Sequence, residues 1–533
     1  MSEPEEKPKE RISIIKEDIP ATTDVPELQG RAGSKFTTSR IELWAFYIYY
    51  IGNNGLSGFN FGPSQFQNLL FLAGYDPSQP PFTTPCSANT DCVLPYLGRT
   101  RDVNSIVLLT NGISFALQAI VLLTIGAWAD YGTWRPNITI FFTILAVAIS
   151  FAWLGVEDPS KWQAGVALYV LGLIAYQCAL TFWTAAFPGL ARDLPEVKES
   201  YKEVARYKKP FEDHERLESL ERNRISNVSF AVCSAGEIII LAVMVGILKG
   251  IRSSESTENN TKAFSVLIAF SGGIWLLCAL PWFFLEKRRP GLSLPPGISL
   301  LTIGFKQTFV AFRECLRLKQ TFLYLIFYFL MGDVLNTTVT VIGTLQNSVV
   351  SYSTLQLTLL LIVGIFTQGL GIYLFWLVQK RFQISTKAML CFNVFWILIL
   401  TIWGLIGVHT DKFGFKHVWE IWAYQAFYGL MVCPWYAYSQ TMISEVSPLP
   451  QMFLFFALFS VVGKTSAFIG PLVSSAIITA SGNNDNMPFA FLFGLGACST
   501  IFLWFVDIKK SRMECEEFVA AEAKRKAFED ASV

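Results

Sequence analysis

Residues 387–408 read KAMLCFNVFWILILTIWGLIGV, in which Lys387 is the one charged residue. A helix needs about 20 consecutive apolar residues to cross the hydrocarbon core of a bilayer. We therefore interpret this stretch as a transmembrane helix. Eleven further stretches share its character, which predicts about twelve spans: 41–62, 104–127, 137–155, 163–188, 227–249, 263–285, 319–343, 355–378, 387–408, 418–442, 453–479 and 488–506.

The composition also favours a membrane protein. Hydrophobic residues make up 52% of the chain and charged residues only 16%, whereas soluble domains carry about 25% charge. The net charge of +1 gives no indication of nucleic-acid binding. The ten cysteines form no CxxC pair and there are three histidines, so we expect neither a metal site nor a cofactor. No apolar signal-peptide core precedes the first span, which is expected to direct insertion itself.

The predicted spans divide into two sets of six, 41–285 and 319–506, on either side of a polar segment, 286–318. Two six-helix halves that rock about a site near the membrane midplane are typical of major facilitator transporters. We therefore expect an all-α membrane protein with a major-facilitator-type bundle of about twelve helices.

Three other polar segments are expected outside the membrane. The tail 1–40 is predicted to be disordered, and the tail 507–533 to form a short polar helix. Loop 189–226 carries a balanced run of charges, and we interpret it as a solvated amphipathic or extended linker. A regulatory role for this loop is the alternative.

The distribution of Lys and Arg predicts the orientation. If both termini are cytosolic, the tails and even-numbered loops hold about 33 of the 42 Lys and Arg residues, and the odd-numbered loops about 8. Positive charge gathers on the cytosolic side of membrane proteins. We therefore expect both termini, and the segment 286–318, in the cytosol.

Two features of the opposite side follow from this orientation. The loop 63–103 contains Cys86 and Cys92, which form either a disulfide, as an oxidising compartment favours, or two free thiols. Of the four N-x-[ST] sequons, only the one at Asn259 faces the side where glycans are added. The other three lie at cytosolic ends of spans or inside one: Asn137, Asn227 and Asn336.

Residues 126–135, between the second and third spans, read GAWADYGTWR. They resemble the facilitator loop motif G-x-x-x-D-x-x-G-x-R. Gly126 permits close approach of helices, and Asp130 can pair with Arg135 or with a helix N-terminus to latch one conformation. Gly132 stands one place earlier than the second glycine of the motif, where Thr133 is found. An ordinary helix-end cap is the alternative interpretation.

Several spans carry polar side chains near their centres, where burial in lipid is costly. Spans one, four, seven and ten line the central cavity of facilitator proteins, and the polar residues cluster in these spans. For any single amide, a hydrogen bond between helices is the alternative to a substrate contact. The candidates for the substrate cavity are Asn53, Asn54, Gln177, Asp333, Asn336, Tyr436 and Gln440.

Three charged residues are expected within the membrane. Asp333 and Asn336 share a helical face, and Asp333 is a candidate for binding the ammonium group of an amino acid or for carrying a coupling proton. Its alternative role is a structural pairing with a neighbouring helix. For Lys464 we favour a structural or conformational role over substrate contact, with Glu237 as its candidate partner.

The most specific sequence signals are FLMGDVLNTT at 329–338 and FALFSVVGKTSAFIGPL at 456–472. Shorter matches are FPGLA at 187–191, RIS at 224–226 and SEVSP at 444–448. Together they resemble the autophagy-related vacuolar amino-acid effluxers of fungi, a branch of the facilitator superfamily. The resemblance extends over all twelve predicted spans and leaves out only the tails.

The resemblance implies residence in the vacuolar membrane. It also implies export of leucine and other neutral amino acids, released by autophagic degradation, from the lumen to the cytosol. The expected partners are therefore amino acids, the lipid bilayer and, as a coupling ion, protons. Neither nucleic acid nor an obligate protein partner is expected.

Two other classes of function are weighed against amino-acid export. A permease for a sugar or an organic acid would use similar amide and aromatic side chains. A scaffold without transport gains nothing from polar residues in its spans, which argues against it. The sequence contains no recognisable nucleophile–base pair, metal cluster or phosphate-binding loop, so we do not expect an enzyme.

Overall fold

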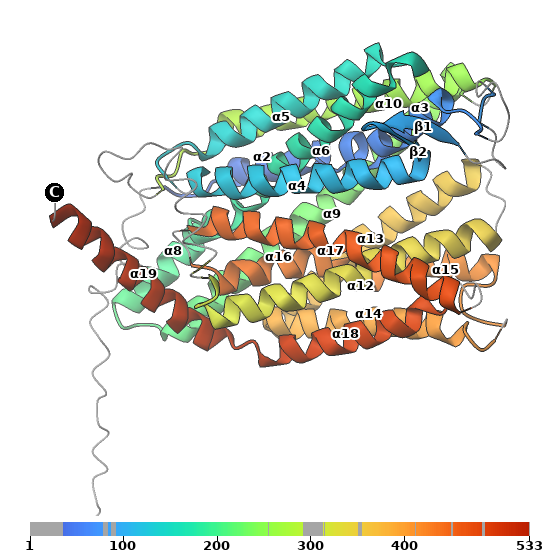
Figure 1. Cartoon of the computed structure of the whole chain (residues 1–533). Coiled ribbons are helices and arrows are strands. Elements are labelled where there is room, and N and C mark those ends of the chain that lie inside the picture. Colours follow the sequence, from blue (N-terminus) through green and yellow to red (C-terminus); the bar gives the residue numbers. More distant parts are fainter. Residues whose placement is uncertain are drawn as a thin grey trace, which may run out of the picture.

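The structure, a computed structural model, describes residues 36–77, 84–86, 92–129, 131–253, 255–291, 313, 315–349, 354–410, 412–448, 451–481 and 486–531. Its long helices run side by side along the molecule (Figure 1). One end carries α8 (Pro195–Ala205) and α19 (Ile508–Ala531), and we call it the terminal face. The opposite end carries the strands β1 (Val93–Tyr96) and β2 (Arg99–Asp102), and we call it the hairpin face.

The first half of the bundle starts with an interrupted pass. It consists of α2 (Arg40–Gly52), the π-helix η1 (Leu56–Phe61) and α3 (Gly62–Ala73). Two short turns, η2 (Trp153–Gly155) and η3 (Pro159–Lys161), and the helix α7 (Phe187–Arg192) lie in its connections. The remaining passes are α4 (Val103–Ala129), α5 (Arg135–Ala152), α6 (Trp162–Thr184), α9 (Phe211–Ile251) and α10 (Thr257–Leu285).

The second half also contains an interrupted pass. It consists of α15 (Val418–Phe427), the π-helix η4 (Tyr428–Val432) and α16 (Pro434–Val446). The continuous passes are α12 (Lys319–Val349), α13 (Thr354–Phe382), α14 (Thr386–Ile406), α17 (Met452–Ala480) and α18 (Pro488–Phe505). In the part of the chain that is described, the two halves together make twelve passes.

The two interruptions have identifiable causes. Gly55 has a φ of 95°, which a glycine adopts without strain, and the Asn54 side chain accepts a hydrogen bond from the Leu56 N–H at 2.9 Å. In the second half, Pro434 has no N–H to continue the helical ladder. The Cys433 N–H instead donates to the Tyr428 carbonyl at 2.9 Å, which is the wider π spacing. Both interruptions are therefore encoded locally.

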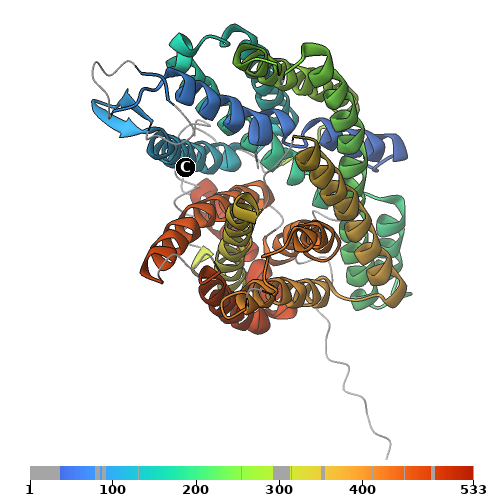
Figure 2. The ribbon, with the colours of Figure 1, turned by 90° about the vertical axis from the view of Figure 1, so that its right-hand side faces the viewer.

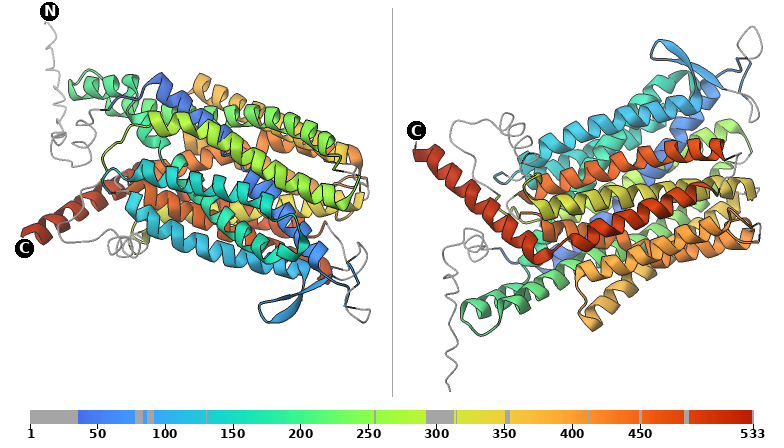
Figure 3. Two further views of the ribbon diagram at one scale, coloured as in Figure 1. Left: turned by 90° about the horizontal axis from the view of Figure 1, so that it is seen from above. Right: turned by 60° about the horizontal axis from the view of Figure 1, so that its bottom comes forward.

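The halves lie next to each other as two groups of helices, seen end-on in Figure 2. Contact between them is made mainly by α9 against α13 and by α4 against α17. A small apolar cluster also crosses the interface, with Phe230 on α9, Ile372 on α13 and Ala437 on α16. Figure 3 shows α19 leaving the terminal face at an angle to the bundle.

The structure confirms the predicted bundle and adjusts its details. Eight of the described helices are long and apolar enough to cross a membrane. The other four passes are the two interrupted ones and the helices α4 and α17. The predicted first span, 41–62, is too short, because the chain remains helical through α3 to Ala73.

The structure adds detail to two predicted polar segments. The loop 189–226 is largely helical, since it comprises α7, α8 and the first turns of α9. Residues 36–39 belong to the predicted disordered tail but pack on α7, where the Thr38 hydroxyl donates to the Leu190 carbonyl at 2.9 Å. Residues 1–35 and most of the segment 286–318 lie outside the described residues.

Candidate transport pathway between the two halves

The interruption of the first pass places polar groups deep inside the protein. Asn53, at the end of α2, is fully buried, whereas Asn54 is half-buried and is engaged by the backbone of η1. Tyr50 lies on the last turn of α2, and its ring contacts Trp183 of α6 and Phe230 of α9 at centroid distances of 4.5 and 5.1 Å. The unwound segment that follows α2 therefore begins beside the aromatic rings of Tyr50, Trp183 and Phe230.

A polar contact between α6 and α17 joins the two halves directly. Gln177 and Thr181 are one turn apart on α6, and the Gln177 amide donates to the Thr181 hydroxyl at 3.3 Å. The Thr181 hydroxyl in turn lies 2.9 Å from the hydroxyl of Ser460 on α17. Gln177 is thus placed beside the interface, where a transported solute has to pass in a rocking mechanism.

Asp333 is bonded to its neighbouring helix. Its Oδ1 atom accepts hydrogen bonds from the Gly470 N–H at 2.9 Å and from the Thr337 hydroxyl at 3.2 Å. A Cβ atom at Gly470 would lie 2.3 Å from the Asp333 carboxylate and 1.7 Å from the Thr337 hydroxyl, so only glycine permits this crossing of α12 and α17. Asn336, on the same helix, is half-buried. This geometry favours the structural alternative for Asp333.

The interrupted tenth pass contributes aromatic and amide side chains. The Tyr436 hydroxyl lies 3.0 Å from the hydroxyl of Tyr428, so the pair spans the π-helical turn. Tyr436 also packs against the apolar cluster that joins the halves. Gln440, one turn further along α16, is half-buried. Tyr436 is therefore the clearest interface residue of this pass.

Of the predicted intramembrane charges Glu237 and Lys464, the structure describes the side chain of Glu237 only. Glu237 is 8% exposed on α9 and makes no hydrogen bond or ion pair with any described residue. Lys464 lies in α17, but its side chain is not among those described, so the predicted pairing with Glu237 stays a prediction.

A network that the sequence did not indicate closes the interface at the terminal face. We call it the terminal latch, and its centre is Glu445 at the end of α16. The Thr386 hydroxyl donates to this carboxylate at 2.7 Å, and Arg222 of α9 approaches it at 3.9 Å. Asn223 donates to Thr386 at 2.8 Å, and Ser219 also donates to Glu445. The latch thus ties α9 of the first half to α14 and α16 of the second.

The facilitator-like motif lies at the same face. Gly126 is buried in α4, and Gly132 has a φ of 61°, so a glycine is favoured at the turn although it stands one place early. The Gly132 carbonyl accepts a hydrogen bond from the Gly291 N–H at 2.7 Å. Arg135 lies within electrostatic range of Glu286. Asp130 lies outside the described residues, so its proposed pairing is untested.

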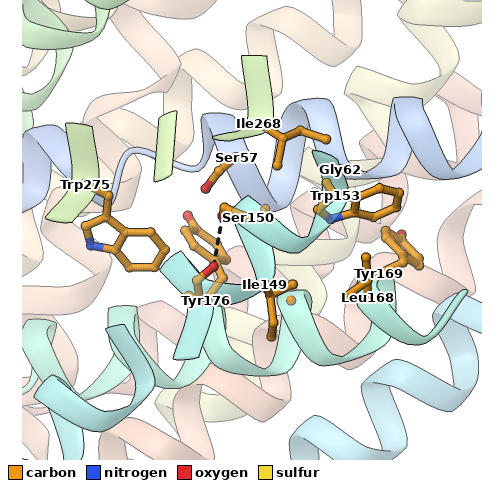
Figure 4. Close-up of a pocket in the computed structure, with 13 residues that line it drawn as sticks. Ser57, Gly62, Ile149, Ser150, Trp153, Leu168, Tyr169, Tyr176, Ile268 and Trp275 are labelled. Carbon is orange, nitrogen blue, oxygen red and sulfur yellow. Dashed lines mark hydrogen bonds between the residues drawn. The ribbon is translucent and has the colours of Figure 1, made fainter. Parts of the chain in front are cut away.

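The structure also contains a small pocket inside the first half (Figure 4). It lies behind the interruption of the first pass, between η1, α5, α6 and α10, and every lining residue belongs to the first half. The Ser150 hydroxyl in its wall is already bonded to the Ala146 carbonyl at 2.9 Å. This pocket is therefore separate from the interface between the halves.

Cys86 and Cys92 form a disulfide beside β1, which Cys92 directly precedes, on the hairpin face. Asn259 lies at the same end of the bundle, in the first turn of α10 after the N-cap Ser256. The other three sequons lie within helices. The Asn137 amide accepts a hydrogen bond from Arg288 at the terminal face, and Asn227 is fully buried in α9.

Solved structures show the same fold. The structure resembles the proton:xylose symporter XylE, with a TM-score of 0.56 and 12% identity over 88% of this chain and 95% of that one. It also resembles the transporter FucP in its outward conformation, with a TM-score of 0.54 and 14% identity over 87% of this chain and 98% of that one. The fold is thus the one that these major facilitator structures share.

The sequence places the chain more narrowly. Residues 38–516 match the family described as "Vacuole effluxer Atg22 like", and the chain belongs to that family. The Autophagy-related protein 22 of Pichia angusta is 22% identical over 457 residues, which cover 80% of each chain. The Autophagy-related protein 22-2 of Aspergillus niger is 21% identical over 556 residues, which cover 90% of this chain and 91% of that one.

Proposed function

We propose that this transporter exports neutral amino acids, leucine among them, from the vacuole lumen to the cytosol by alternating access. The observation that carries the proposal is the terminal latch, because it joins the two halves at one end of the bundle through bonds that a rocking motion has to break. Membership of the vacuolar effluxer family supports the compartment and the direction of transport.

The proposed orientation places the terminal face in the cytosol. The concentration of Lys and Arg in the tails and even-numbered loops supports it. The disulfide between Cys86 and Cys92 and the sequon at Asn259 then lie on the lumenal side, where oxidation and glycosylation occur. With this orientation, the latch holds the cytosolic gate closed.

Within the pathway, we propose that Asn53, Asn54, Gln177, Tyr436 and Gln440 contact the solute. Amide and phenol groups suit the polar backbone of an amino acid, and aromatic rings suit an apolar side chain. The acidic Glu237 near this path argues against an organic anion as the substrate. We assign Asp333 a positioning role at the crossing of α12 and α17, and Asn336 a supporting one.

The test is counterflow of labelled leucine by the purified protein in liposomes, with glucose and malate as competing solutes and with or without a pH gradient. The expected result is exchange that unlabelled neutral amino acids inhibit and that glucose and malate leave unchanged. A Ser460→Trp variant, which obstructs the contact between α6 and α17, is the matched inactive control. Transport of glucose or malate in place of leucine would refute the proposal.

A further inference from the structure

Glu237 is a buried acidic group whose charge nothing in the described structure neutralises. Its side chain is more than nine-tenths buried, and it has no hydrogen bond or ion pair with any described residue. A carboxylate in such a position is costly unless a cation or a hydrogen-bond donor accompanies it. Among the residues that the structure describes, none supplies such a partner in this conformation.

The immediate surroundings of Glu237 suit a cation. It lies one turn beyond Cys233 on α9, and the Cys233 thiol donates to the Tyr50 carbonyl on the last turn of α2 at 3.4 Å. The C-terminal end of a helix carries partial negative charge on its free carbonyl groups. Glu237 therefore lies one turn from the point where α9 touches the C-terminal end of α2, a helix that stops in the middle of the bundle. Such helix ends bind cations in transporters with discontinuous helices.

Aromatic rings complete these surroundings. Glu237 lies close enough to the hydroxyl groups of Tyr50 and Tyr176 to interact with them electrostatically. Tyr50 is held in place by its contacts with Trp183 and Phe230. Aromatic faces attract organic ammonium groups, and the attraction increases when water is excluded.

Glu237 also lies close to the contact between the two halves. One turn away, Ser234 packs against Gly369 of α13 in the second half, where an added Cβ would lie 2.9 Å from the Ser234 Cβ. Ile240 and Leu241, on the following turn, join a cluster with Leu56 of η1 and Ile365 of α13. Glu237 thus lies at the level where the interrupted first pass, α9 and the second half meet.

We infer that Glu237 binds the ammonium group of the transported amino acid. The inference rests on the proposed function and specifies how its site recognises the solute. Asp333 is less suited to this role, because its Oδ1 atom is occupied by the Gly470 N–H and the Thr337 hydroxyl. The carboxylate of Glu237 accepts hydrogen bonds from the ammonium group. The positive charge of the solute thereby neutralises the buried negative charge when the solute enters.

The experiment measures how well leucine and N-acetylleucine, in which the amino group carries no charge, inhibit leucine counterflow in liposomes. Glu237→Gln keeps the shape of the side chain and removes its charge. We expect this variant to bind leucine about 10- to 100-fold more weakly, as the loss of a charged hydrogen bond predicts. The inhibition constant of N-acetylleucine should change by less than about threefold, so that the preference for the free ammonium group disappears. Unchanged inhibition by leucine in Glu237→Gln would overturn the inference.

Two controls separate recognition from folding and from ion coupling. Asp333→Asn is the matched variant, and it should keep the preference for leucine over N-acetylleucine even if its thermal stability falls. Glu237→Gln should be at least as thermally stable as the parent protein, because it removes a buried charge that no described residue neutralises. If Glu237→Gln instead abolishes a stimulation by sodium and keeps the preference for leucine, the group binds an inorganic cation and the inference is wrong. Failure of the parent protein to bind leucine would refute the proposed function itself.

Discussion

Two charged clusters at the terminal face differ in what they join. The first joins only the first half and the chain directly before and after it, and Arg289 is its centre. Arg289 donates to Glu42 and to Asp193, both at 2.7 Å, and to the Thr38 hydroxyl at 3.0 Å. All four residues are buried, so this cluster fixes the start of α2, the end of α7 and the chain after α10 as one body.

The second cluster is the terminal latch, which joins the two halves. Here the closest donors to Glu445 are hydroxyl groups, and the nearest guanidinium atom, on Arg222, is 3.9 Å away. Arg222 makes a longer bond of 3.4 Å to the Ser444 carbonyl. The guanidinium at Glu445 is therefore more loosely held than the one at Glu42.

The difference separates a permanent joint from a gate. Charged hydrogen bonds at 2.7 Å are close to optimal, and breaking one inside a protein leaves an uncompensated charge. A latch made of hydroxyl donors and one distant arginine costs less to open, because its partners retain other hydrogen bonds or reach water. We expect the hydrogen bonds at Arg289 to persist through the transport cycle and those of the terminal latch at Glu445 to break when the gate opens.

The largest expected effect is the loss of Arg289. In Arg289→Met, the carboxylates of Glu42 and Asp193 are left buried without their main partner, which should cost about 3–5 kcal/mol. The measurement is the yield of monodisperse protein on size exclusion, together with its thermal stability. Arg288→Met is the matched control, because Arg288 is exposed and bonds to Asn137. Equal yield and stability of the two variants would contradict the role of the cluster as a joint.

Glu445→Gln should have a smaller effect, on conformation more than on stability. Without the charge, the attraction of Arg222 is lost and the hydrogen bonds to Thr386 and Ser219 weaken, which should shift the balance of open and closed gates by about 10-fold. The measurement is the labelling rate of a cysteine introduced at Ser460. Glu516→Gln, an exposed change on α19, is the control. An unchanged labelling rate would show that Glu445 does not hold the gate.

A weaker effect is expected from the contact of α19 with α9. Arg512 pairs with Glu215, and both side chains are partly exposed, so screening by solvent limits the strength of the pair. Arg512→Glu should change the rate of leucine transport by about twofold to fivefold at most. The double variant Arg512→Glu with Glu215→Arg should restore the original rate. A loss that the second change does not restore would indicate a role for Arg512 other than this pair.

The assignment of the latch to the cytosolic side is tested without any change in activity. Asn259→Gln should abolish a glycosidase-sensitive shift in mobility, since Asn259 lies at the end opposite the latch. Asn137→Gln, at the terminal face, is the matched control and should leave the shift in place. A shift that depends on Asn137 would reverse the orientation and place the latch in the lumen.

Hydropathy was sufficient to predict the bundle. The stretch 387–408 corresponds to α14 within two residues at each end, because a membrane helix depends on the length of its apolar run. The interruption after α2 was not predicted, although Asn54 and Gly55 are the residues that cause it. A local break in a helix leaves the average hydropathy of a long window almost unchanged. Hydropathy alone therefore does not indicate the interruption after α2.

The candidate site was less predictable, because contacts between helices join residues that are far apart in the sequence and no local pattern indicates them. Asp333 stood out as an acidic residue within a span, but only the position of Gly470 on another helix reveals that its Oδ1 atom is occupied. In the sequence, Arg222 and Arg289 do not differ from the other basic residues of the cytosolic loops. Their partners Glu445 and Glu42 lie at the ends of spans, where charged residues are common and do not indicate which residue they bind.

The most direct test of alternating access is the distance between the two halves at the terminal face. Spin labels at Leu285, at the end of α10, and at Phe382, at the end of α13, report it in liposomes, in a variant without the free cysteines. The account predicts a distribution with a short and a long distance, and a shift of population between them when leucine is added. A single distance that leucine leaves unchanged, in protein that transports leucine, would contradict the account.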